Sequence, residues 1–269
     1  MIHRAKKSLG QNFLKSQPAL NKMCEAGEVN SNDVILEIGP GKGALTEKLL
    51  EKAKKVIAVE KDDTLSEFLR EKFREETENG KLKIINDDIL NFNLNKNGFQ
   101  NLKYKIIANI PYNITGAIIK NFLSNKVKPK VMVLLVQKEV AERIVARDDK
   151  ESILSLSVKA YGDPKYEMRV SKKYFSPSPK VDSAIISIKN ISNDNFKTDK
   201  EEEIFFELIK SGFAHKRKLL LKNIEKILEK YGVSKEKITK QIVLKENSRA
   251  EDKKLDDWLS ISKYLSTKN

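Results

Sequence analysis

The chain has 269 residues, 39% hydrophobic and 33% charged, which is enough for the core of one or two domains and excludes a disordered protein. No apolar run approaches the roughly 18 residues that span a bilayer, and the N-terminus is basic and polar where a secretory signal would be apolar. We therefore expect a soluble, cytoplasmic protein that does not associate with a membrane. One cysteine and two histidines exclude disulfides and a zinc site, and the net charge of +14 favours a polyanion such as nucleic acid.

The first 24 residues form a basic arm that contains no acidic residue. Its cations include Arg4, Lys6 and Lys7, with Lys15 and Lys22 further along. Because lysine and arginine neutralise phosphates, we interpret this arm as a contact to nucleic acid. The alternative for the charge as a whole is a lysine-rich surface that serves only solubility.

From residue 34 onward, short apolar runs alternate with segments of helical periodicity. The expected strands cover residues 34–38, 56–59, 82–85, 104–108 and 131–136. Five strands that alternate with helices predict a parallel sheet with right-handed crossovers. Two later runs, 165–170 and 181–188, flank a Ser/Pro-rich loop with no room for a crossover helix. They are expected to pair antiparallel at the edge of the sheet.

Beyond residue 189 the pattern changes from strands to helices. Residues 190–199 are polar and read as a linker, and three helical segments follow at 204–213, 219–231 and 255–265. The sequence therefore predicts two basic domains. One is an α/β domain over 1–190, and the other is a small α-helical domain over 191–269.

Candidate nucleotide-binding residues follow the first three strands. Gly39 and Gly41 let a strand turn sharply into a helix while the backbone approaches a ligand, although a tight turn with nothing bound is the alternative. Glu60 follows the next strand, where a carboxylate can accept from both ribose hydroxyls. Asp88 can accept from an adenine amine, unless it and Asp87 only cap a helix or turn. Dinucleotides and S-adenosylmethionine both fit this pattern.

The fourth strand is followed by Asn109-Ile110-Pro111-Tyr112. An exocyclic adenine amine is a poor nucleophile, so an enzyme must hold it with acceptors and orient its lone pair. The side-chain oxygen of Asn109 and the carbonyl before Pro111 are suitable acceptors, and Tyr112 offers a face on which an extruded base can stack. The alternative is an Asn-capped turn with a buried tyrosine.

These residues resemble the ribosomal RNA adenine dimethyltransferases, and most closely the small-subunit, KsgA-type members. The resemblance covers nearly the whole chain and consists of seven motifs in family order, at residues 8–14, 37–46, 59–62, 109–114, 137–141, 175–184 and 213–218. It implies a Rossmann-like class I methyltransferase sheet with an antiparallel edge hairpin and a helical RNA-binding tail.

The resemblance also implies roles for individual residues. It implies S-adenosylmethionine as cofactor, bound by Asn12, Leu14, Gly39, Gly41, Glu60, Asp88 and Asn109. Asn109, Pro111 and Tyr112 would handle the target adenine, and Phe175 would close on its other face. The implied product is two adjacent N6,N6-dimethyladenosines in the 3′-terminal hairpin of 16S ribosomal RNA, within the 30S subunit or its precursor. The RNA-binding residues would be Arg4, Lys6, Lys7, Lys216, Arg217 and Lys218.

Two other functions fit part of the pattern. A large-subunit methyltransferase of the macrolide-resistance type shares the cofactor motifs and the 109–112 turn, but the 9–14 opening, residues 179–184 and the helical tail favour the small-subunit type. A non-catalytic RNA-binding assembly factor would have no need of Glu60 and Asn109 together. Residues 147–154 depart from the family's usual stretch, so docking there is expected to differ. We expect a monomer with no obligate protein partner.

Overall fold

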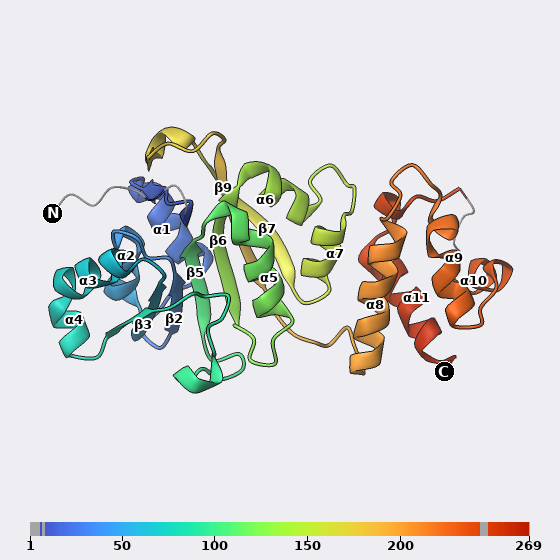
Figure 1. Ribbon diagram of the computed structural model, residues 1–269, viewed down its shortest axis with the longest axis horizontal. Helices are drawn as coiled ribbons and strands as arrows, with labels where there is room; N and C mark the ends of the chain where they lie inside the picture. Colours follow the sequence, from blue (N-terminus) through green and yellow to red (C-terminus); the bar gives the residue numbers. More distant parts are fainter. Residues whose placement is uncertain (1–5, 7–8, 243–246, 269) are drawn as a thin grey trace. The chain divides into compact units, whose positions relative to one another are not determined.

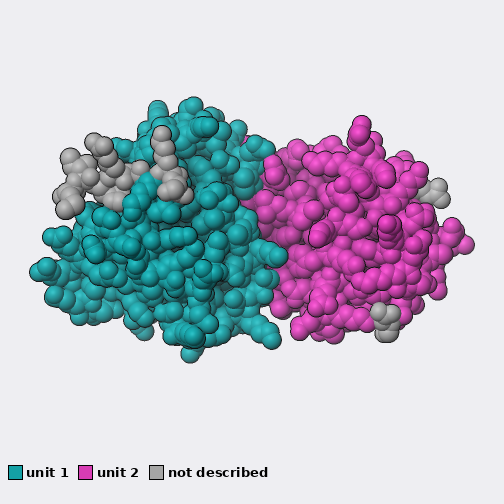
Figure 2. All heavy atoms as spheres, in the orientation of Figure 1, with its two compact units in different colours: residues 1–141, 163–191 teal, residues 142–162, 192–269 magenta. Residues whose placement is uncertain are grey.

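The computed structural model describes residues 6, 9–242 and 247–268. The chain divides into two compact units, shown in two colours in Figure 2: residues 1–141 with 163–191, and residues 142–162 with 192–269. The boundary after residue 191 lies one residue from the expected boundary after residue 190. Residues 142–162, however, belong to the helical unit and not to the sheet domain in which we expected them.

A seven-stranded sheet forms the centre of the first unit, among the residues that the structure describes (Figure 1). Its strand order is β4-β3-β2-β5-β6-β9-β7. The strands are β2 (Val34–Ile38), β3 (Lys55–Glu60), β4 (Leu82–Asn86), β5 (Lys105–Asn109), β6 (Val131–Gln137), β7 (Asp163–Val170) and β9 (Ser183–Lys189). The first five are parallel, and β9 runs antiparallel to both β6 and β7. The predicted α/β fold with an antiparallel edge pair is confirmed.

The five inner strands of this sheet are buried on both faces, which explains why they read as continuous apolar runs, whereas the edge strands β4 and β7 are partly exposed. Ile107 of β5 and Val133 of β6 belong to a core cluster that also holds residues of three helices. Ile106 and Leu134, which point to the other face, are fully buried as well. The helices of this unit are α1 (Gln17–Ala26), α2 (Ala44–Lys52), α3 (Asp63–Lys72), α4 (Arg74–Glu78), α5 (Thr115–Leu123), α6 (Lys138–Val145, whose last four residues group with the other unit), η2 (Asn95–Asn97), η3 (Tyr112–Ile114) and η4 (Lys172–Tyr174).

A second, two-stranded sheet joins distant parts of the first unit. Strand β1 (Phe13–Leu14) pairs antiparallel with β8 (Phe175–Ser176). The sequence pattern did not predict this pair, because two residues are too few to show a period. The pairing brings the N-terminal segment beside the Ser/Pro-rich loop.

The second unit is helical. It contains α7 (Ile153–Lys159), α8 (Asp199–Gly212), α9 (Leu220–Lys230), α10 (Lys235–Ile242), η5 (Ala250–Asp252) and α11 (Leu255–Ser266). Residues 142–162 belong here because α7 packs on α8 and the ring of Tyr161 stacks on Phe206, with centroids 5.9 Å apart. The divergent residues 147–154 also contact this unit, since Lys150 pairs with Glu251 at 2.7 Å. None of the helices in the described ranges has the length and apolar character that crossing a membrane requires.

Candidate active site

A cavity of about 510 Å³ lies at the carboxyl ends of β2, β3, β4 and β5. In a parallel sheet these ends meet at one edge, so residues far apart in sequence come together there. The cavity is lined by nine of the predicted site residues, Asn12, Leu14, Gly39, Gly41, Glu60, Asp88, Asn109, Pro111 and Tyr112. Its volume lies within the range of small-molecule sites.

The turn after β2 holds Gly39, Gly41 and Gly43 at left-handed φ angles, and at the last two a Cβ would also collide with a side chain. Gly41 has φ +59°, and a Cβ there would lie 2.9 Å from Cδ1 of Phe13. Gly43, the N-cap of α2, has φ +79°, and its Cβ would lie 2.5 Å from Cε2 of Phe73. Left-handed φ angles and this close approach both exclude larger residues. The turn packs against the chain's own side chains at these two points, while Gly39 and Gly41 line the cavity and leave their backbone accessible to a ligand.

Glu60 is fixed at the end of β3 by two backbone hydrogen bonds. Its Oε2 accepts from the amide of Gly41 at 3.1 Å and its Oε1 from the amide of Asp62 at 2.9 Å. Burial raises the pKa of this carboxyl, and the two amides partly offset that effect. Each oxygen keeps acceptor capacity beyond its one bond, so the group can also accept from a ligand in the cavity.

A second carboxyl, Glu37 of β2, also lines the cavity and was not singled out from the sequence. Its side chain is buried, and its Oε2 accepts from the Thr46 hydroxyl at 2.7 Å. Burial raises the pKa of Glu37 to about 8, from its ordinary value of 4.5. The group is therefore largely protonated at neutral pH. The sequence did contain a signal for this residue, because Glu37 is an acidic residue within an otherwise apolar strand.

Glu37→Gln is expected to flatten the dependence of stability on pH. The folded-state pKa lies above the unfolded value, so this carboxyl favours the folded state most at pH below 4.5, and the contribution is lost as pH rises through about 8. The slope from this group is about 1.4 kcal/mol per pH unit between those limits. Urea unfolding of both proteins from pH 5 to 9 measures it. Parallel curves would contradict the assignment.

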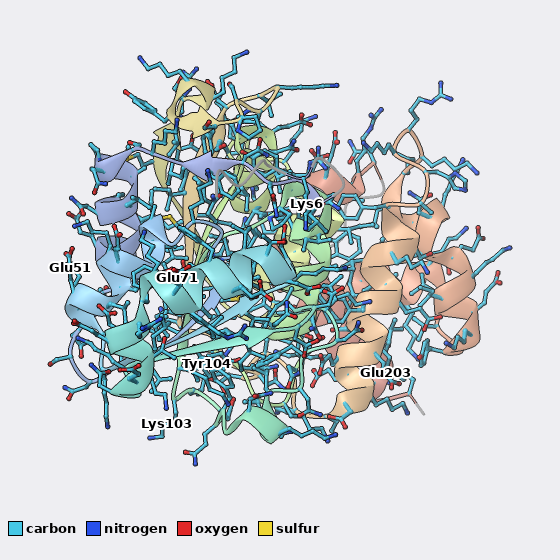
Figure 3. The ribbon with its side chains drawn as sticks, turned by 60° about the vertical axis from the view of Figure 1, so that its left-hand side comes forward. Lys6, Glu51, Glu71, Lys103, Tyr104 and Glu203 are labelled. Atoms are coloured by element: carbon cyan, nitrogen blue, oxygen red, sulfur yellow. The ribbon has the colours of Figure 1, made fainter. Side chains whose placement is uncertain are left out.

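The N-terminal segment is tied to the cavity through Asp62, the N-cap of α3. The Asp62 carboxylate accepts from Lys6 Nζ at 2.8 Å and from Gln11 Nε2 at 2.9 Å. Lys6, labelled in Figure 3, forms an ion pair with a buried acid of its own chain, and its contact to RNA phosphates stays a prediction. Arg4 and Lys7 lie outside the described residues.

Asn109 is the last residue of β5, the strand that pairs with β2, and Tyr112 begins η3 just after it. The Asn109 amide nitrogen donates to the carbonyl of Asn12 at 3.1 Å, which sets the orientation of its side chain. The Tyr112 hydroxyl is 2.6 Å from the Ser183 hydroxyl. Burial raises the pKa of Tyr112, so the phenol is neutral at physiological pH. Both side chains are half-buried and line the cavity.

Asp88 has partners of its own within the chain. Its Oδ2 is 2.7 Å from Lys61 Nζ, and its Oδ1 accepts from the amide of Leu90 at 3.0 Å. The Lys61 ammonium holds the pKa of Asp88 below its ordinary value. Asp88 thus caps a turn, as the simpler interpretation required, and it also lines the cavity.

The remaining predicted site residues do not line the cavity. Phe175 is buried in the core cluster, where its backbone pairs with Leu14. Its role as a second aromatic against the target base stays a prediction. Lys216, Arg217 and Lys218 are exposed between α8 and α9 of the helical unit.

The fold and the cavity together define a Rossmann-like methyltransferase. Residues 2–267 match the family described as ribosomal RNA adenine dimethylase. A Ribosomal RNA small subunit methyltransferase A from Fusobacterium nucleatum is 41% identical, over 98% of this chain and 99% of its own. One from Mycoplasmopsis pulmonis is also 41% identical, over 96% and 98%. The chain therefore belongs to the ribosomal RNA adenine dimethylase family.

Solved structures show the same fold over nearly the whole chain. A dimethyladenosine transferase from Plasmodium falciparum has a TM-score of 0.82 with 26% identity, covering 95% of this chain and 98% of its own. The 23S rRNA methyltransferase ErmE has a TM-score of 0.76 with 22% identity, covering 94% and 99%. At 22% identity, the similarity to ErmE shows a shared fold and nothing further.

Proposed function

We propose that this protein uses S-adenosylmethionine to convert two adjacent adenosines in the 3′-terminal hairpin of 16S ribosomal RNA to N6,N6-dimethyladenosine. The observation that carries the proposal is the 109–112 turn, which places an amide and an aromatic ring beside a nucleotide-sized cavity. Small-subunit enzymes at about 40% identity over nearly the full chain favour the small-subunit RNA. ErmE, a large-subunit enzyme, is 22% identical.

The lining of the cavity fits S-adenosylmethionine. Gly39 and Gly41 line the cavity with backbone alone, which lets a ligand approach closely, and Glu60 supplies acceptors suited to two ribose hydroxyls. We assign Asn12, Leu14, Gly39, Gly41, Glu60, Asp88 and Asn109 to cofactor binding. When bound, the cofactor supplies a methyl group already activated by a positively charged sulfur.

The chain's own residues then have to position the adenine. The Asn109 side-chain oxygen and the carbonyl of Ile110, held by the following Pro111, would accept from the exocyclic amine and direct its lone pair toward the methyl carbon. The ring of Tyr112 would stack on one face of the base, and Phe175 is assigned to the other. No strong base is needed, because the methylated ammonium is acidic and releases its proton to water.

We further propose that the substrate is the RNA within the 30S subunit or its precursor, and that methylation accompanies small-subunit biogenesis in the cytoplasm. The exposed Lys216, Arg217 and Lys218 are assigned to RNA phosphates. The protein would act as a monomer without an obligate protein partner.

Labelled methyl transfer to under-methylated 30S particles tests the proposal, with 50S particles and both free RNAs in parallel. Nucleoside analysis is expected to show dimethyladenosine only in the small-subunit RNA. Label confined to the large-subunit RNA would replace this function with that of a resistance enzyme. Cofactor binding without transfer to any RNA would indicate a non-catalytic assembly factor.

A further inference from the structure

A loop beside the cavity has surface features that the proposed reaction does not use. Residues 171–182, here the 171–182 loop, connect β7 to β9 and are drawn in gold in Figure 1. Val170 pairs with Ser183, and Ser183 pairs with Gln137 at the carboxyl end of β6. The loop therefore projects from the same edge of the sheet as the cavity. Ser176, within the loop, lines that cavity.

The loop exposes an aromatic ring among cations. The Tyr174 side chain is 42% exposed, and the ammonium of Lys173 lies 5.2 Å from the centroid of its ring. Lys172 and Lys180 are also exposed, and none of the three lysines forms an ion pair with a described residue. An exposed ring beside unneutralised cations is the combination that binds single-stranded nucleic acid, since bases stack on the ring and phosphates meet the cations.

Hydrogen bonds hold this loop in one shape. The Asp182 carboxylate accepts from the amide of Lys172 at 2.9 Å, and the Ser178 hydroxyl donates to the Lys172 carbonyl at 3.0 Å. The Tyr174 carbonyl accepts from the amide of Lys15 at 2.9 Å, next to the β1–β8 pair. A surface fixed before binding loses little conformational entropy when a ligand binds. The backbone that carries Tyr174 is thus held at a set position relative to the cavity.

We propose that the 171–182 loop binds the single-stranded RNA next to the target nucleotide. Tyr174 stacks on the base of a neighbouring nucleotide, and Lys172, Lys173 and Lys180 contact the phosphates on either side. This inference rests on the proposed function. It identifies the 171–182 loop as a surface that helps to select the RNA substrate. With two adjacent target nucleotides, one base can occupy the cavity while its neighbour stacks on Tyr174.

Tyr174→Ala tests the stacking contact. It is expected to raise KM for the RNA hairpin about ten-fold, with KM for S-adenosylmethionine unchanged. Tyr174→Phe keeps the ring and should retain the wild-type KM. Phe68→Ala is the matched control, because Phe68 is 38% exposed on α3 of the same unit and does not line the cavity. A hairpin with 2-aminopurine next to the target should show fluorescence quenching that Tyr174→Ala abolishes.

The lysines are tested by their effect on salt dependence. The triple variant Lys172→Gln/Lys173→Gln/Lys180→Gln is expected to reduce the slope of log affinity against log salt by about two. The control neutralises Lys54, Lys103 and Lys130, which are exposed and precede β3, β5 and β6 at the opposite edge of the sheet; Lys103 is labelled in Figure 3. Both triple variants change the net charge equally. If only the net charge of the protein mattered, the slope of log affinity against log salt would therefore fall by the same amount in both.

The outcomes separate this inference from the proposed function. An active wild type whose KM and fluorescence are unaffected by Tyr174→Ala would overturn the stacking contact and leave the proposed function standing. Equal slopes for the two triple variants would overturn the phosphate contacts. If the wild type methylates no RNA, the proposed function fails. The loop then remains an RNA-binding surface only if this inactive wild type quenches the probe and Tyr174→Ala abolishes the quenching, and the inference fails if it does not.

Discussion

Asn109→Ala is expected to reduce kcat for methyl transfer by about 10³-fold while changing the affinity for S-adenosylmethionine much less. The substitution removes the acceptor to which we assign the orientation of the adenine amine, and misalignment at the reacting atoms is costly. The hydrogen bond to the Asn12 carbonyl, which now orients the side chain, is lost too. Single-turnover transfer to the RNA hairpin and calorimetric titration of the cofactor measure the two effects separately.

Asn113→Ala is the matched control for this experiment. Asn113 belongs to the same turn and lines the same cavity, but its side chain is exposed. We expect it to retain most of the wild-type kcat. Equal losses of transfer and of cofactor affinity in Asn109→Ala would show that the residue holds the cofactor and does not direct the amine.

Glu60→Ala is expected to weaken binding of S-adenosylmethionine by about 100-fold, because the two hydrogen bonds that we assign to the ribose hydroxyls are lost. The carboxylate already stands at the end of β3, fixed by the amides of Gly41 and Asp62. Isothermal titration of the wild type and the variant gives the ratio of dissociation constants.

Loss of Glu60 also removes a support of the glycine turn, so a second ligand separates the two causes. An analogue of S-adenosylhomocysteine without ribose hydroxyls should bind the wild type and Glu60→Ala with similar affinity. If the analogue loses as much affinity as the natural product, the variant has disturbed the turn at Gly41, and the ribose contact is refuted.

The sheet could be read from the sequence because its inner strands are buried on both faces. Such strands are continuous apolar runs, and β2 and β6 were located to within a residue of their observed bounds. The β1–β8 pair could not be found, since its partners lie about 160 residues apart and each has two residues. The assignment of 142–162 to the helical unit depends on side-chain packing around Tyr161, which has no local sequence pattern.

The position of the cavity was predictable for a similar reason. Parallel strands place their carboxyl ends at one edge, so Gly39, Glu60 and Asn109 had to converge there. The ion pair between Lys6 and Asp62 was not predictable, because the two residues are far apart in sequence and charge alone does not select a partner. The burial of Phe175 likewise depends on the β1–β8 pair.

The tie between the N-terminal segment and the cavity has a practical consequence for producing the protein. Gln11 holds Asp62, and the carbonyl of Asn12 orients Asn109, so both residues belong to the lining of the cavity. Protease trimming up to residue 12 would remove both contacts. A preparation that is shortened at its N-terminus therefore has to keep Gln11 and Asn12.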